Sequence, residues 1–185
     1  MFETLLHLDG QALLFIQEHL RQEWLTPAVK VITSLGNAGI FWIVLTAILL
    51  VVPKTRKVGC MSALALIGAL IVDNLILKNW VARIRPYEVI DGLNRLIEAQ
   101  KDYSFPSGHT GSSFASAVVC FLELPKKYGI PILILAILIA CSRLYLGVHY
   151  PTDVIAGVII GIGLALAARY ICNRIAGKLA EGKAE

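Results

Sequence analysis

Charged residues and paired cysteines are both scarce in this sequence. Only 16% of the 185 residues are charged, whereas 57% are hydrophobic. Each of the four cysteines falls within an apolar run and none belongs to a Cys-x-x-Cys pair; they are Cys60, Cys120, Cys141 and Cys172. This spacing argues against a disulfide framework and against a zinc site. We interpret the cysteines as small packing residues.

A concentration of positive charge is missing as well. The formal net charge of +4 comes from basic residues that are scattered over the ends of apolar runs. Nucleic-acid binding needs a basic face with interleaved aromatic residues, so no nucleic-acid partner is expected. No cleavable signal peptide is expected either, because polar residues stand where a basic region and an apolar core would be: Glu3, His7, Asp9 and Gln11.

Long apolar runs are what the sequence has in abundance. The runs are continuous, without the alternation of membrane strands, which predicts membrane-embedded helices. We therefore expect an all-α, polytopic membrane helical bundle that forms one domain over residues 1–185. It should hold about five to six transmembrane helices, with a transmembrane core over residues 36–172 and a polar tail over 173–185.

Five apolar segments are the candidate spans. They cover residues 38–52, 58–80, 106–124, 130–145 and 152–172. Polar residues interrupt residues 1–35, which we interpret as one or two amphipathic helices broken near Thr26-Pro27, with a first transmembrane helix at about 8–25 as the alternative. Gly157 and Gly161 form a GxxxG pair, which indicates helix packing.

Two short connections carry basic residues. They are residues 53–57 and 125–127, and such basic caps are typical of the cytoplasmic side of a membrane. With these caps and the carboxyl-terminal tail on that side, the charged motifs described next gather on the opposite, extracytoplasmic face.

The stretch Ser142–Asp153 places ionisable residues between two apolar runs. Because charges near hydrocarbon are costly, Arg143, His149 and Asp153 point to a site. Pro151 suits the start of a helix, so Asp153 should lie in its first turn and reach back to one imidazole nitrogen of His149. The other nitrogen would be free to act as base or nucleophile. An interfacial histidine with a capping aspartate is the alternative.

Two further motifs offer donors for a phosphate. Lys78 and Arg85 precede the long polar connection 81–105, and with Arg143 they supply the cations that a tetrahedral phosphate needs. The Ser107-Gly108 step opens the next helix, whose free backbone amides form an anion site.

Three motifs occur in order along the chain. They are K-x6-R-P (Lys78 to Pro86), P-S-G-H (Pro106 to His109) and S-R-x5-H-x3-D (Ser142 to Asp153). This set resembles the type 2 phosphatidic acid phosphatase superfamily, and the intervening apolar spans resemble its membrane-bound lipid phosphatase branch. Residues 1–35 lie outside the resemblance.

The resemblance implies a mechanism through a phosphohistidine. His149 would attack phosphorus, Asp153 would orient and charge-stabilise it, and His109 would protonate the leaving oxygen and then activate water. It implies no metal and no cofactor. The phosphate would be held by Lys78, Arg85, Ser107, Gly108 and Arg143, with Arg83 as a further contact.

The resemblance also implies a lipid phosphate substrate at the plasma membrane. Undecaprenyl diphosphate, phosphatidylglycerol phosphate and phosphatidate are the candidates, and the oligomeric state stays open. A lipid-dependent phosphotransferase would use the same motifs. A non-catalytic lipid-binding or transport protein on the same scaffold is a further alternative.

Overall fold

The computed structural model describes residues 2–181 and confirms the all-α class. Over that range the chain forms helices and no strand. The elements are α1 (Phe2–Phe15), a π-helical turn at Ile16–Leu20, α2 (Thr26–Ser34), a 3₁₀ turn at Asn37–Gly39, α3 (Ile40–Val51), α4 (Arg56–Ala69), the π-helical segment η3 (Leu70–Leu77), α5 (Lys78–Val81), α6 (Pro86–Val89), α7 (Gly108–Glu123), α8 (Lys126–Tyr145) and α9 (Pro151–Glu181).

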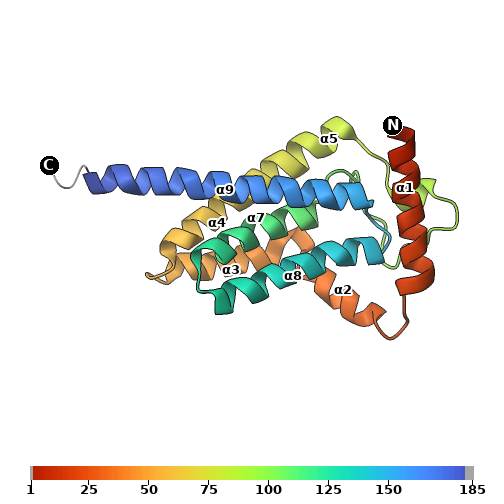
Figure 1. Cartoon of the computed structure of the whole chain (residues 1–185), viewed down its shortest axis with the longest axis horizontal. Coiled ribbons are helices and arrows are strands. Elements are labelled where there is room, and N and C mark those ends of the chain that lie inside the picture. The colour runs from red at the N-terminus through yellow and green to blue at the C-terminus, as the bar shows by residue number, and fades with distance from the viewer. Residues whose placement is uncertain (1, 182–185) are drawn as a thin grey trace.

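Helix α7 lies at the centre of the bundle. It packs against α4, α8 and α9, and the four helices run side by side in Figure 1. Its sequence is rich in glycine, serine and alanine, which let neighbouring helices approach closely. Most of its residues are buried, and they include Gly111, Ser113, Ala115, Ser116 and Ala117.

The expected number of five to six spans is not confirmed. In the described part of the chain, three helical stretches are long and apolar enough to cross a membrane: Arg56–Val89, Lys126–Tyr145 and Pro151–Leu179. A fourth results if Thr26–Ser34 and Asn37–Val51, bent by 44°, count as one span. Helix α7, expected as a span, has 16 residues. It is therefore about 24 Å long, short of the ~30 Å hydrocarbon core.

Helix α1 lies across one end of the bundle (Figure 1). The chain turns at residues 21–25, just before Thr26, so the helical break falls next to the expected position. A helix spanning residues 8–25 is therefore not formed. The bend between α2 and α3 is made by Ala38 and Gly39, which have φ angles of 49° and 67°.

The GxxxG pair packs against the central helix, as predicted. A Cβ at Gly157 would lie 2.9 Å from the Ser107 carbonyl oxygen, and one at Gly161 would lie 2.7 Å from the Gly111 carbonyl oxygen. Helix α9 therefore touches the backbone of α7. It continues through most of the expected polar tail to Glu181, and residues 182–185 lie outside the described part.

Candidate active site

The three motifs meet at one end of the bundle. Helix α5 ends there, α7 begins there, and the turn between α8 and α9 closes it (Figure 1). A cavity of about 750 Å³ lies among them. Its polar wall is formed by Asn37, Asn74, Lys78, Arg85, Gln100, Asp102, Gly108, His109, Ser112, Arg143 and His149.

His149 is buried and held in one orientation. Its Nδ1 lies 3.5 Å from Asp153 Oδ2, four residues on in the first turn of α9. This is longer than an ordinary hydrogen bond, and Nδ1 has no closer partner among the described residues. Asp153 Oδ2 also accepts hydrogen bonds from Ser104 Oγ and, at 3.0 Å, from the Tyr150 amide. The carboxylate therefore favours the tautomer with the proton on Nδ1.

The other imidazole nitrogen is available for chemistry. His149 Nε2 lies 3.2 Å from Arg85 Nη1, which donates to it in the Nδ1-protonated tautomer. Burial lowers the pKa of His149 to about 3; Asp153 opposes this shift, and Arg143 and Arg85 add to it. At neutral pH the imidazole is therefore uncharged and keeps a lone pair on Nε2, as a nucleophile needs.

Three buried cations share the cavity with this imidazole. Lys78, Arg85 and Arg143 all line the cavity. Arg143 Nη1 donates to Thr33 Oγ1 at 2.7 Å, whereas its Nε has no hydrogen-bond partner among the described residues. An unpartnered buried guanidinium nitrogen is costly, so a ligand with acceptor oxygens would be stabilised here.

Lys78 and Arg85 both contact a residue that the motifs did not point to. Lys78 Nζ lies 2.5 Å from Asp102 Oδ2, and Arg85 Nη2 lies 2.6 Å from Asp102 Oδ1. Burial acts to raise the pKa of Asp102, but hydrogen bonds and charge from Lys78 and Arg85 outweigh it and hold that pKa at about 2. Asp102 is therefore ionised at neutral pH.

His109 faces the same cavity from the first turn of α7. Its Nε2 lies 3.0 Å from Asn37 Oδ1, on the bend between α2 and α3. Gly36 leaves room for the ring, because a Cβ there would lie 2.6 Å from His109 Cδ2. Sequence reasoning missed Gly36 and Asn37, which belong to no motif; a Gly-Asn pair at a helix end was the available signal.

Of the two residues at the Ser107-Gly108 step, only Gly108 lines the cavity. Ser107 is fully buried behind the wall. Its Oγ accepts a hydrogen bond from Thr110 Oγ1 at 2.9 Å, and its amide donates to the Asp153 carbonyl oxygen at 3.1 Å. The expected phosphate contact of Ser107 stays a prediction, because its hydroxyl and amide are engaged within the protein in this arrangement. Ser107 joins the start of α7 to the start of α9.

Arg83 contacts the site residue Asp153 from outside the cavity. Its Nη1 donates to Asp153 Oδ1 at 2.6 Å and to Thr152 Oγ1 at 2.7 Å, and its Nη2 donates to Asp9 Oδ2 at 2.8 Å. Its guanidinium also lies 3.6 Å from the centre of the Tyr150 ring. Arg83 therefore positions Asp153, and its further phosphate contact stays a prediction.

Asp9 links helix α1 to this network. It is buried and also accepts hydrogen bonds from the Thr152 amide at 3.1 Å and the Thr152 hydroxyl at 2.5 Å. The amino-terminal segment thus contacts the beginning of α9, although it lies outside the family motifs. An acidic residue between the leucines of α1 was the signal in the sequence.

Comparison with known proteins shows the family of the chain. Residues 58–176 match the PAP2 superfamily. Over 120 residues the chain is 38% identical to the undecaprenyl-diphosphatase of Sulfolobus acidocaldarius, covering 65% of this chain and 58% of that protein. It is 31% identical to phosphatidylglycerophosphatase B of Bacillus subtilis, covering 77% of this chain and 73% of the relative.

A solved structure agrees with the fold. The crystal structure of a transmembrane PAP2 type phosphatidylglycerolphosphate phosphatase from Bacillus subtilis aligns with a TM-score of 0.75 at 28% identity, covering 93% of this chain and 88% of that one. The fold and the site thus define a multi-pass membrane protein of the lipid phosphatase type. The chain belongs to the PAP2 superfamily, in its membrane-bound lipid phosphatase branch.

Proposed function

We propose that the chain hydrolyses a lipid phosphate or lipid diphosphate through a phosphohistidine at His149. The main support for this proposal is the position of His149 Nε2. This nitrogen is unprotonated in the tautomer that Asp153 favours. It faces a cavity lined by Lys78, Arg85 and Arg143. A nucleophile beside three cations matches the needs of phosphoryl transfer.

In the first step, His149 Nε2 attacks phosphorus and the bond from phosphorus to the leaving oxygen breaks. His109, on the same cavity wall, gives its proton to that oxygen. The imidazole becomes a positively charged phosphoimidazolium, which the Asp153 carboxylate stabilises. In the second step, His109 takes a proton from water, which attacks the phosphohistidine and releases phosphate.

The cavity has an apolar side that suits a lipid. Beyond its polar wall it is lined by Ile43 of α3 and by Leu66, Ile67 and Leu70 of α4 and η3. Ile43, Ile67 and Leu70 are each more than half exposed on the outside of the bundle. We infer that acyl or prenyl chains approach between α3 and α4 while the phosphate reaches the cations. The named substrates of the two relatives, undecaprenyl diphosphate and phosphatidylglycerol phosphate, fit this division, and phosphatidate would too.

Phosphate release from a panel of lipid phosphates tests this function. The purified protein in detergent micelles is expected to release phosphate from at least one lipid monophosphate or diphosphate and to remain active in EDTA, because the cations supply the charge stabilisation. Orthovanadate, which mimics the trigonal-bipyramidal transition state, should inhibit. Activity lost in EDTA and restored by magnesium would contradict the mechanism, and His149→Ala is the inactive control.

We further propose that the site opens on the extracytoplasmic face of the plasma membrane. The basic connections at 53–57 and 125–127 and the end of α9 lie at the end of the bundle opposite the site (Figure 1). Positive residues favour the cytoplasmic side. In a background without the four native cysteines, Lys54→Cys and Glu98→Cys should react with an impermeant thiol reagent from opposite sides of the membrane. Reaction of both from one side would refute this orientation.

A further inference from the structure

Asp102 occupies a place at the proposed phosphate site where an anion is expected. Its two carboxylate oxygens lie 2.5 Å from Lys78 Nζ and 2.6 Å from Arg85 Nη2, and its backbone oxygen accepts from Arg85 Nε at 2.9 Å. Two of the three cations on the cavity wall are thus paired with one carboxylate. Arg143 is the third, and it has no carboxylate within ion-pair distance in the described part of the chain.

Arg85 has no donor left for a substrate in this arrangement. Its Nη1 donates to the Val148 carbonyl oxygen at 2.7 Å and approaches His149, while its Nη2 donates to Asp102 Oδ1 and, at 3.3 Å, to the Tyr103 carbonyl oxygen. A guanidinium has five N–H donors in a fixed fork. A phosphate that approaches Arg85 Nη2 therefore competes with the Asp102 carboxylate for this donor.

Asp102 lies in a segment that is anchored to the bundle by few backbone hydrogen bonds. The Asp102 side chain is half exposed. Its segment is fixed at one end by the Leu96 amide on the Leu146 carbonyl oxygen, and at the other by the Ser104 amide on the Arg83 carbonyl oxygen. Between these two points, the segment is held by the contacts of Asp102 with Lys78 and Arg85 and by a contact of Gln100.

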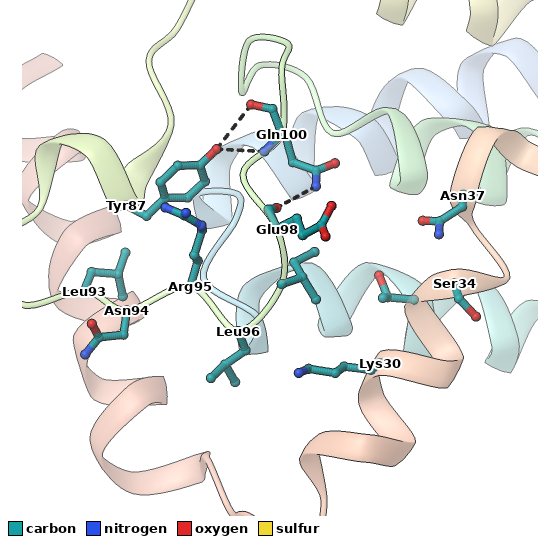
Figure 2. Close-up of a pocket in the computed structure, with 12 residues that line it drawn as sticks. Lys30, Ser34, Asn37, Tyr87, Leu93, Asn94, Arg95, Leu96, Glu98 and Gln100 are labelled. Carbon is teal, nitrogen blue, oxygen red and sulfur yellow. Dashed lines mark hydrogen bonds between the residues drawn. The ribbon is translucent and has the colours of Figure 1, made fainter.

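The backbone of Gln100 is bonded to the Tyr87 hydroxyl (Figure 2). The backbone N–H donates to this hydroxyl at 3.1 Å, and the hydroxyl donates to the backbone carbonyl oxygen at 3.4 Å.

Space for a movement of Asp102 lies beside the segment. Figure 2 shows a polar hollow between this segment and α2, with Lys30 and Arg95 on its walls. The hollow has a volume of about 1030 Å³ and shares Asn37 and Gln100 with the catalytic cavity. The hollow thus offers the segment adjoining space outside the packed core.

We propose that Asp102 is a specificity residue that competes with the substrate's phosphate for Lys78 and Arg85. Only an anion of higher charge displaces it: a phosphomonoester or a diphosphate carries about two or more negative charges, whereas the phosphodiester of an ordinary phospholipid carries one. The carboxylate therefore keeps the phosphodiesters of the surrounding bilayer out of the site. This inference rests on the proposed function.

The test compares Asp102→Asn with the wild-type protein. Orthovanadate binding is measured by direct titration in detergent, in a buffer alkaline enough for vanadate to be a dianion, and inhibition by phosphatidylglycerol is measured during hydrolysis of a lipid monophosphate. The amide keeps the size of the side chain but removes the competing charge. If the site is open about one tenth of the time in the wild type, vanadate should bind about tenfold more tightly to the variant. Phosphatidylglycerol should inhibit the variant and leave the wild type unaffected.

Glu98→Gln is the matched control, because Glu98 is an exposed acid of the same segment that does not line the catalytic cavity. It should bind vanadate as the wild type does. Unchanged or weaker vanadate binding by Asp102→Asn would overturn the proposal and make Asp102 a clamp that positions the cations. Asp102→Ala is a second variant that guards against misfolding of the first. It also lacks the competing carboxylate, so it too is expected to bind vanadate more tightly than the wild type. A wild-type protein that neither binds vanadate nor releases phosphate would instead refute the proposed function.

Discussion

The two histidines occupy different environments, which fits different roles. His149 is almost fully buried and lies between Asp153 and Arg85. His109 is partly exposed to the cavity and lies against Asn37, a neutral partner. A nucleophile benefits from a fixed lone pair, whereas a group that gives and takes a proton needs access to the leaving oxygen and to water.

The effect of His109→Ala should depend on the leaving group. An alkoxide leaving a lipid monophosphate needs a proton most, a phosphate leaving a diphosphate needs it less, and p-nitrophenolate needs it least. The rate of enzyme phosphorylation is therefore expected to fall by roughly 10²- to 10⁴-fold for the monophosphate, with smaller losses in that order.

Rapid-quench kinetics measures this rate, because a shared slow dephosphorylation would hide the order in steady-state rates. Equal losses for the three substrates would remove His109 from the acid role and leave it a phosphate-binding residue.

The sequence predicted the residues whose chemistry and spacing follow a motif, and it missed those brought in by tertiary contacts. The cavity gathers Lys78, Arg85, His109, Arg143 and His149, as expected. Two motif residues do not line the cavity, because a residue next to a site residue can point elsewhere: Ser107 faces Thr110, and Arg83 faces Asp9 and Asp153. Asp102, Asn37 and Asp9 come from a loop, a bend and a distant helix. Local signals existed for Asn37 and Asp9, but none of them showed that these residues reach the site.

At the scale of the elements, the central helix carries His109 to the site and depends on close contact with α9. Gly161 provides that contact, because its α-carbon faces the backbone of α7 at Gly111. Helix α7 looks like a transmembrane span in the sequence, since its apolar and small residues pack in a protein interior as well as in lipid. Its burial among other helices could not be read from composition.

Gly161→Ala should destabilise the bundle by about 1–3 kcal/mol, because the added methyl overpacks the contact between α7 and α9. A Cβ there would lie 2.7 Å from the Gly111 carbonyl oxygen and 2.8 Å from Phe114 Cβ. The variant is expected to unfold at a lower temperature in detergent.

Gly163→Ala is the matched control on the same helix, because a Cβ at Gly163 meets no atom within 4 Å. It should unfold close to the wild-type temperature. Equal unfolding temperatures for the two variants would show that the contact between α7 and α9 can relax and does not hold His109 in place.

At the scale of the whole molecule, the fold collects polar chemistry at one end and leaves an apolar surface elsewhere. The connection 81–105, the start of α7 and the turn between α8 and α9 meet there, with α1 across them (Figure 1). The order of apolar runs and basic caps predicted which segments share that end. The sequence could not predict how the loop and α1 close over it, because their contacts are polar and specific to single residues, such as that of Asp9 with Thr152.

Trapping of the phosphoenzyme tests the central claim most directly. The purified protein is mixed with a lipid phosphate labelled in its terminal phosphate and quenched in alkali, which preserves phosphohistidine. The account predicts label on the wild-type protein that is lost in acid, that maps to His149, and that is absent from His149→Ala. Phosphate release by the wild type without any trapped label, or label of equal amount on His149→Ala, would contradict it.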